Sequence, residues 1–325
     1  MKNLVDENGK IIYDNIIEQY SWVTAENQKC ILSPDSDGLL CGLLMSAMFN
    51  WQIVGFYDSK IMALKENERV EDSVFLDMEI FRNYVKSLGQ HMLLWNKKSI
   101  PPNWDNFCNC ISPNNIRKYD GKSNFSKKYP LGTIHILLGI VGHKKQIEIK
   151  KDAICPLLYT DGTFKNLFNY PENCLSWLDF LCAENENSPL KSVFFNDHYT
   201  TASLMIALKN FFDKLKEIGN GERGADKIVI SDRNGDVKNI ENGKIIESIK
   251  DTAVKFLQFL SELTGWNFDE NKWTFENLLI YKFTKGTIKP NGRNFDELIA
   301  KNPLSWAMTS TLAIEYTLEK PDKLK

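Results

Sequence analysis

The chain has 325 residues, of which 43% are hydrophobic and 12% aromatic, and its formal net charge is −2. This length and apolar content can bury the core of one large domain or of two ordinary ones, which excludes a disordered chain. The balanced charge excludes binding to nucleic acid through a high overall positive charge.

The cysteines and the apolar runs bear on the compartment. The seven cysteines form no CxxC pair and most lie in or beside apolar runs, which predicts buried thiols in a reducing cell. No uninterrupted apolar stretch approaches the length needed to span a bilayer. We therefore expect a cytoplasmic protein with no membrane partner.

The first hundred residues alternate between strand and helix patterns. Apolar residues at helical spacing between Ile11 and Tyr20 predict an opening amphipathic helix. The patterns that follow predict a strand over residues 29–32, a helix over 39–49 and a strand over 52–57. A polar connection then leads to a further predicted strand over 73–76. Successive strand–helix–strand units imply parallel pairing with right-handed crossovers. The predicted fold class is therefore α/β, with a mostly parallel sheet flanked by helices.

Basic residues gather in the middle of the chain. From Lys97 to Lys151 there are eleven Lys or Arg residues against three acids, a local surplus of eight. Residues 96–130 also interleave cations with aromatic side chains, which suits single-stranded nucleic acid, although aromatic side chains would equally pin a solvated loop to the core. We interpret 96–130 as a basic insertion or lid, and Lys127, Lys128 and His143 are candidate substrate contacts.

The pattern after residue 130 is mainly helical. Apolar and capping patterns predict four helices, over residues 131–141, 173–183, 197–218 and 245–263. A short strand is predicted at 227–230 and a hairpin turn at Asn242-Gly243. We expect two domains, an α/β domain over 1–150 and a helical or α+β accessory or substrate domain over 151–325.

Acidic residues follow the predicted strands. Asp35 and Asp37 lie between a strand and a helix, and Asp77 follows a later strand. Because open α/β sheets place their sites at the carboxyl ends of parallel strands, we expect these acids to meet. Two carboxylates about 4 Å apart repel by about 4 kcal/mol at an effective dielectric constant of 20, which a divalent cation or a basic partner must offset. The alternative is that Asp35 or Asp37 only caps the helix.

These motifs resemble the DHH phosphoesterase superfamily. The resemblance covers about the first hundred residues and rests on Pro34-Asp35-Ser36-Asp37-Gly38 followed by Gly42, on the strand 52–57, and on Phe75-Leu76-Asp77. In that family a PDxDG-like turn and a second aspartate bind metal, and an Asp-His-His triplet follows. Here Gly89-Gln90-His91 stands at the triplet, so that only its last position is retained.

The resemblance implies a divalent-metal-dependent phosphodiester hydrolase, a phosphoesterase or nuclease that acts on nucleic acid or a nucleotide. By the family pattern, the candidate ligands of Mn²⁺ or Mg²⁺ are Asp35, Asp37, Asp77 and His91, and the candidate catalytic residues are Asp37 and His91. Single-stranded nucleic acid and cyclic dinucleotides are the expected partners. The family's further downstream acid has no evident counterpart, and Asp197 with His198 is one candidate for the missing ligands.

Other interpretations stay open. Loss of two triplet residues favours a catalytically degenerate DHH-like protein that binds nucleic acid, nucleotide or a protein partner. The segments 35–40 and 227–236 also resemble a haloacid-dehalogenase-like phosphatase, with Asp35 as nucleophile and Asp37 as acid or base. A protein partner or a homo-oligomer is compatible with the helical second half. Asp58 is interpreted as a loop residue and His135 as a core residue.

Overall fold

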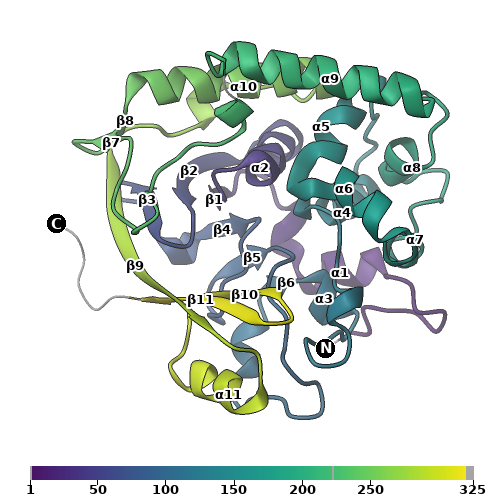
Figure 1. The fold of residues 1–325 in the computed structure, drawn as a ribbon, viewed down its shortest axis with the longest axis vertical. Helices are drawn as coiled ribbons and strands as arrows, with labels where there is room; N and C mark the ends of the chain where they lie inside the picture. Colours follow the sequence, from purple (N-terminus) through teal and green to yellow (C-terminus); the bar gives the residue numbers. More distant parts are fainter. Residues whose placement is uncertain (1, 222, 320–325) are drawn as a thin grey trace.

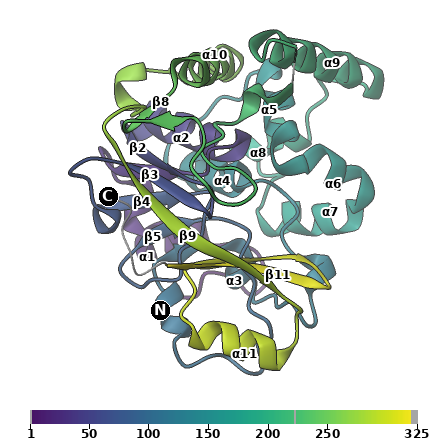
Figure 2. The same cartoon turned by 60° about the vertical axis from the view of Figure 1, so that its left-hand side comes forward.

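The computed structural model describes residues 2–221 and 223–319, and its main element is a nine-stranded mixed sheet (Figures 1 and 2). The strand order is β10-β11-β9-β3-β2-β1-β4-β5-β6. The strands are β1 (Lys29–Leu32), β2 (Gln52–Tyr57), β3 (Ile61–Lys65), β4 (Ser73–Leu76), β5 (Lys86–Leu88), β6 (Cys110–Ile111), β9 (Leu278–Ile288), β10 (Ser305–Ser310) and β11 (Ala313–Glu319).

Most helices lie together on one side of this sheet, with the two longest, α9 and α10, along the top of Figure 1, whereas α11 lies beneath the β10–β11 hairpin. The helices are α1 (Tyr13–Gln19), α2 (Ser36–Phe49), α3 (Pro113–Ile116), α4 (Thr133–Lys144), α5 (Ile154–Tyr159), α6 (Thr163–Asn169), α7 (Pro171–Phe180), α8 (Pro189–Phe194), α9 (Thr201–Ile218), α10 (Glu247–Thr264) and α11 (Gly292–Ala300). In the described residues no helix is both long and apolar enough to cross a membrane.

The first half of the sheet confirms the predicted α/β class. Strands β2, β1, β4, β5 and β6 are parallel, and β1 pairs with β2 on one side and with β4 on the other. The chain therefore reverses its direction of travel across the sheet at β1. At such a switch point the loops after neighbouring strands diverge and leave a crevice at their carboxyl ends. The acids that follow β1 and β4 lie at this edge of the sheet.

Side chains of the strands alternate between two apolar layers. Cys30 and Leu32 of β1 pack into the large core under the helices, whereas Ile31 packs into a second cluster on the opposite face. That second cluster is closed by Leu304, from the segment before β10. Because both faces are buried, the strands are continuously apolar, which made the prediction of β1, β2 and β4 accurate to the residue.

Strands from both halves of the chain form one sheet. β9 pairs with β3, and β11 pairs with β9, so that backbone hydrogen bonds cross the predicted boundary at residue 150. Figure 2 shows β9 running from the main sheet to the β10–β11 hairpin, with α11 beneath it. The division into two domains stays a prediction.

Three local predictions were wrong. The connection after β2 contains the antiparallel strand β3, whose apolar run 61–64 is buried between β2 and β9. The basic stretch 96–130 is not only a loop, because β6 extends the sheet and α3 follows it. Residues 227–230 form no strand; the Ile228 amide instead donates to the Pro34 carbonyl at 2.7 Å, which packs the segment beside the acid turn.

Other local predictions were confirmed. Asn242-Gly243 joins β7 (Ile240–Glu241) to β8 (Lys244–Ile245), with positive φ angles at both turn residues, as a two-residue hairpin turn requires. Helices α9 and α10 end at the predicted Gly219 and Gly265. α9 begins at Thr201, after a Thr200 cap, and not at Asp197.

Gly38 in the first turn of α2 tests how closely the acid turn is packed. A Cβ atom at this position would lie 2.0 Å from the Ser33 carbonyl oxygen. We expect Gly38→Ala to lower the free energy of unfolding in urea by about 1–3 kcal/mol or more, because backbone must move to relieve the overlap. Gly292→Ala, in the first turn of α11, is the matched control, since its Cβ would meet its nearest neighbour at 3.8 Å. Equal losses in both variants would contradict this account.

Candidate metal centre

The turn between β1 and α2 places Asp35 and Asp37 at the carboxyl edge of the sheet. Asp35 is the N-cap of α2, and its carboxylate accepts a hydrogen bond from the Gly38 amide at 3.2 Å. Asp37 lies in the first turn of α2 and is completely buried. Helix capping therefore accounts for Asp35 in this structure but not for Asp37, whose carboxylate faces a different helix.

The carboxylate of Asp37 bonds to the N-terminus of α4. Its Oδ2 accepts from the Thr133 amide at 2.5 Å and its Oδ1 from the Ile134 amide at 2.9 Å. The partial positive charge of a helix N-terminus favours a carboxylate at this place. Gly132 permits the approach, because a Cβ atom there would lie 3.0 Å from Asp37 Oδ2. Two backbone amides of α4 therefore donate hydrogen bonds to one buried acid.

Asp77 lies where β4 ends, next to Asp37. It is 1% exposed, and its backbone turns out of the strand with a φ angle of +62°. Its Oδ1 accepts a hydrogen bond from the Thr133 hydroxyl at 2.6 Å, whereas its buried Oδ2 has no hydrogen-bond partner among the described residues. Thr133 therefore connects Asp37 and Asp77, through its amide and its hydroxyl.

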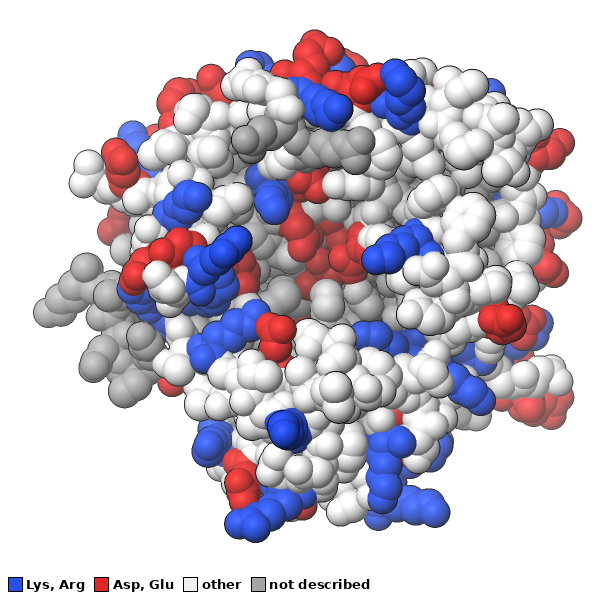
Figure 3. Space-filling view, viewed as in Figure 1, with Lys and Arg blue, Asp and Glu red and all other residues white. Residues whose placement is uncertain are grey.

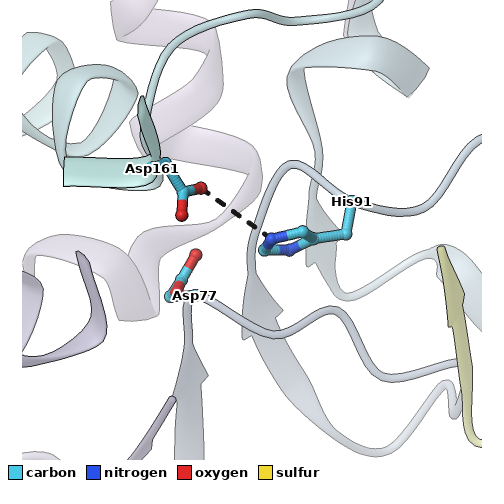
Figure 4. Close-up of side chains that lie close together, drawn as sticks. All are labelled: Asp77, His91 and Asp161. Atoms are coloured by element: carbon cyan, nitrogen blue, oxygen red, sulfur yellow. Dashed lines mark ion pairs between the residues drawn. The ribbon is translucent and has the colours of Figure 1, made fainter. Parts of the chain in front are cut away.

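His91 reaches the same place from the loop after β5. Its Nε2 lies 3.9 Å from Asp161 Oδ2, and its Nδ1 lies 3.6 Å from Glu79 Oε2. The Gln90 side-chain amide donates to Asp161. Figure 4 shows Asp77, His91 and Asp161 pointing toward one another from three different parts of the chain.

Asp161 completes the cluster from the 3₁₀ turn between α5 and α6. Each of Asp77, His91 and Asp161 offers a ligand atom, and these atoms lie within 4.8 Å of one another. Carboxylate oxygens and one imidazole nitrogen form a donor set that suits Mn²⁺ and, through its oxygens, Mg²⁺. Asp77 Oδ2 is buried, has no hydrogen-bond partner among the described residues and is free to bind a cation, so the residues present fit a metal ion.

The pKa values of the acids show the cost of bringing them together. Burial is the main cause that raises the pKa of Asp37, Asp77 and Asp161. Repulsion from Asp161 further raises the pKa of Asp37, and repulsion from Asp37 raises that of Asp77. Burial lowers the pKa of His91, but Glu79 and Asp161 together raise it to about 9. A divalent cation would relieve the repulsion and displace the bound protons.

Two cavities adjoin His91. The larger, about 640 Å³, is bounded by Lys128, Phe125, Tyr170, Asp161 and residues of β10. The smaller, about 160 Å³, lies on the side of Glu79 and Lys285. Figure 3 shows acidic side chains in the depth of a central hollow and basic side chains around its rim. This arrangement suits an anionic ligand that reaches a cation held by the acids.

The structure brings only one of the three candidate substrate contacts to this site. Lys128 lines the larger cavity and donates to the Met308 carbonyl at 3.2 Å, and burial lowers its pKa. Lys127 is exposed and does not line that cavity. His143 lies in the last turn of α4, about 15 Å along the helix from Thr133, where it pairs with Asp14 at 2.9 Å.

Other residues considered from the sequence lie apart from the candidate centre. Asp197 and His198 are exposed in the turn before α9. Asp58 accepts the amides of Lys60 and Ile61 in the turn after β2, a structural role. His135 is buried against Phe194, and burial lowers its pKa to about 4, as expected for a core histidine.

Sequence reasoning missed Asp161, Glu79 and Thr133. Asp161 follows the buried apolar run 154–158 and precedes Gly162, so it resembles the acid turns after β1 and β4. That similarity was the available signal, but the run forms a helix and not a strand. Nothing in the local sequence marks Thr133 or Glu79, because each acts through residues distant in the chain.

Comparisons of the chain with models of protein families, with curated proteins and with solved structures find no match. The DHH resemblance therefore rests on the motif residues alone, and membership of that superfamily stays a proposal.

The raised pKa values predict that the metal-free protein loses stability as the pH rises. A folded state that holds protons more tightly than the unfolded chain is most stabilised at low pH. For the three acids this stabilisation is complete below about pH 4 and declines as pH rises through their raised pKa values. For His91 it declines between about 6.5 and 9. We expect the melting temperature in EDTA to fall from pH 5 to pH 9.

Asp77→Asn is the comparison variant, because an amide does not titrate and does not repel Asp37. Its melting temperature should fall less over the same pH range, and saturating Mn²⁺ should stabilise the wild-type protein most at the high end. Identical pH profiles for wild type and Asp77→Asn would contradict the assignment of the raised pKa values to this cluster.

Proposed function

We propose that the protein is a divalent-metal-dependent phosphodiester hydrolase that acts on nucleic acid or a nucleotide. The observation that supports it best is the convergence of Asp77, His91 and Asp161, from the ends of β4 and β5 and from the α5–α6 turn, beside the buried Asp37. A cluster of acids in the interior costs stability unless a cation compensates it. The acids lie together at the switch point of an α/β sheet although their repulsion lowers stability. This placement favours a function that uses a bound cation.

Each residue has a role in this proposal. Asp77, Asp161 and His91 would hold Mn²⁺ or Mg²⁺, and the neighbouring Asp37 and Asp35 would add negative charge that favours the cation. When bound, the cation activates water and neutralises charge on a phosphoryl oxygen. Thr133 fixes the distance between Asp37 and Asp77. The His91 side chain is partly exposed, so it is placed to contact the scissile phosphate or the cation.

The larger cavity supports a substrate with phosphate and aromatic groups. Lys128 offers a positive charge within it, and Phe125 and Tyr170 offer aromatic faces. Cations along a backbone and aromatic faces against bases are the common means of binding single strands. We therefore propose single-stranded nucleic acid or a cyclic dinucleotide as the substrate, bound between β10 and α6.

Two other functions compete with this one. A degenerate protein that binds without hydrolysis is favoured by Gly89 and Gln90, which occupy two of the three triplet positions. A haloacid-dehalogenase-like phosphatase would use Asp35 as nucleophile and the turn at Asp232 for metal. Asp232 is partly exposed and accepts backbone amides within its own turn, so nothing in its contacts favours that second role.

The hydrolase proposal is tested with Asp77→Asn. Wild-type protein should cleave a single-stranded oligonucleotide or a cyclic dinucleotide in Mn²⁺ and not in EDTA. The variant should lose about 100-fold or more in kcat/KM, because metal-assisted charge stabilisation contributes several kcal/mol and each 1.4 kcal/mol is tenfold in rate. Asp105→Asn, at an exposed acid, is the control and should keep full activity.

The outcomes separate the three functions. Binding that survives both Asp77→Asn and EDTA, with no cleavage in any metal, would establish the degenerate binder instead. Cleavage of phosphomonoesters with a phosphoaspartate on Asp35, detected by mass spectrometry and absent in Asp35→Asn, would establish the phosphatase.

Lys128 and Lys127 form a matched pair for the substrate site. Lys128→Met should lower kcat/KM about 10- to 100-fold, mainly through KM, because a hydrogen bond to a charged group contributes about 1.5–3 kcal/mol. It should also reduce the slope of log affinity against log salt by about 0.7 for a single strand. Lys127→Met changes the neighbouring exposed lysine and should have an effect of about twofold or less. Equal effects of both changes would place the substrate elsewhere.

A further inference from the structure

Glu79 is a buried acid that the proposed metal centre does not use directly. It belongs to the loop between β4 and β5, is 1% exposed, and accepts the amides of His91 and Met92, each at 2.9 Å. Its Oε2 also lies 3.6 Å from His91 Nδ1. One carboxylate therefore contacts both the backbone and the ring of the histidine that faces the candidate centre.

Gly89 shows that this contact has a specific geometry. A Cβ atom on Gly89 would lie 2.8 Å from Glu79 Oε2, so the carboxylate occupies the space that a side chain at position 89 would need. Position 89 carries no side chain, and the Glu79 carboxylate, from the loop between β4 and β5, occupies the space beside it. The absence of a side chain at 89 is thus the condition for Glu79 to reach His91.

The two ring nitrogens of His91 have different surroundings. Nε2 lies 3.4 Å from the Gln90 side-chain nitrogen and faces Asp161, as Figure 4 shows, whereas Nδ1 is buried and has no hydrogen-bond partner among the described residues. A histidine that binds a cation through one nitrogen commonly donates the proton on the other to a carboxylate, which fixes the ring and strengthens the ligand. A rotation of the ring that brings Nδ1 closer to Glu79 Oε2 would satisfy this buried donor.

We propose that Glu79 is a positioning residue of the candidate metal centre: its carboxylate holds the backbone and the Nδ1 side of His91, and so directs Nε2 to the cation. This inference rests on the proposed function, since it gives the cation to His91. It assigns a role to an acid that lies on none of the motif positions.

Glu79→Gln tests the proposal, and Asp120→Asn is its control. Asp120 is likewise fully buried and accepts two backbone amides, from Lys97 and Ser123, but no described contact joins it to a histidine. Both variants lose one carboxylate oxygen as an acceptor. Titration with Mn²⁺ followed by electron paramagnetic resonance, without substrate, measures the affinity of each variant. We expect Glu79→Gln to weaken binding about 10- to 100-fold and Asp120→Asn to change it less than about twofold.

A second measurement reads the ring of His91 in the metal-free protein. The chain has four histidines, so ¹⁵N-histidine spectra can be assigned with single His→Gln variants. The ring signals of His91 should shift in Glu79→Gln and stay unchanged in Asp120→Asn. Gly89→Ala, which leaves Glu79 intact but displaces its carboxylate, should repeat both effects and serves if Glu79→Gln does not fold.

The outcomes distinguish this inference from the proposed function. Wild-type binding of Mn²⁺ with unchanged affinity in Glu79→Gln, or equal losses in both variants, would overturn the role of Glu79. If the wild-type protein binds no Mn²⁺, the proposed function fails, and unchanged ring signals in Glu79→Gln would then overturn the contact as well.

Discussion

The hydrogen bonds between the Asp37 carboxylate and the N-terminus of α4 are the interaction on which the rest of the site depends. They fix α4 against α2, and α4 in turn presents the Thr133 hydroxyl to Asp77. Without them Asp37 would be an unpaired buried carboxyl group next to two further acids, which would have to take up a proton or destabilise the fold. A helix N-terminus can compensate only part of such a charge, since it carries about half an elementary charge. The remaining imbalance leaves a place for a cation.

This electrostatic argument also explains why the acids and the lysines are separated in space. A lysine among Asp37, Asp77 and Asp161 would neutralise them and occupy the place of a metal ion. Instead Lys128 lies in the adjoining cavity, bonded to the Met308 carbonyl, where a phosphate could reach it. The net charge of −2 does not reveal this separation of acidic and basic side chains. A chain with nearly equal numbers of both can still place acids inside the central hollow and lysines around it.

The sequence predicted the elements whose signals are local. Continuous apolar runs defined β1, β2 and β4. Parallel strands place their carboxyl ends at one edge of the sheet, and there Thr133 bonds both to Asp37, which follows β1, and to Asp77, which follows β4. β3 was missed because a polar segment surrounds its short apolar run. Asp161 was missed because a helical turn, and not a strand, delivers it. Contacts such as those of Thr133 and Glu79 arise only when distant segments pack, and no periodicity encodes them.

The residues at positions 89 and 90 are explained by the contacts of the loop that carries His91. Because Gly89 has no side chain, the Glu79 carboxylate occupies the space next to it and reaches His91. The Gln90 side chain donates a hydrogen bond to Asp161, which favours the charged form of that acid. Each of these two positions therefore has a partner from a different loop. Such contacts hold His91 and the charge of Asp161 at the same place, as the proposed metal centre requires.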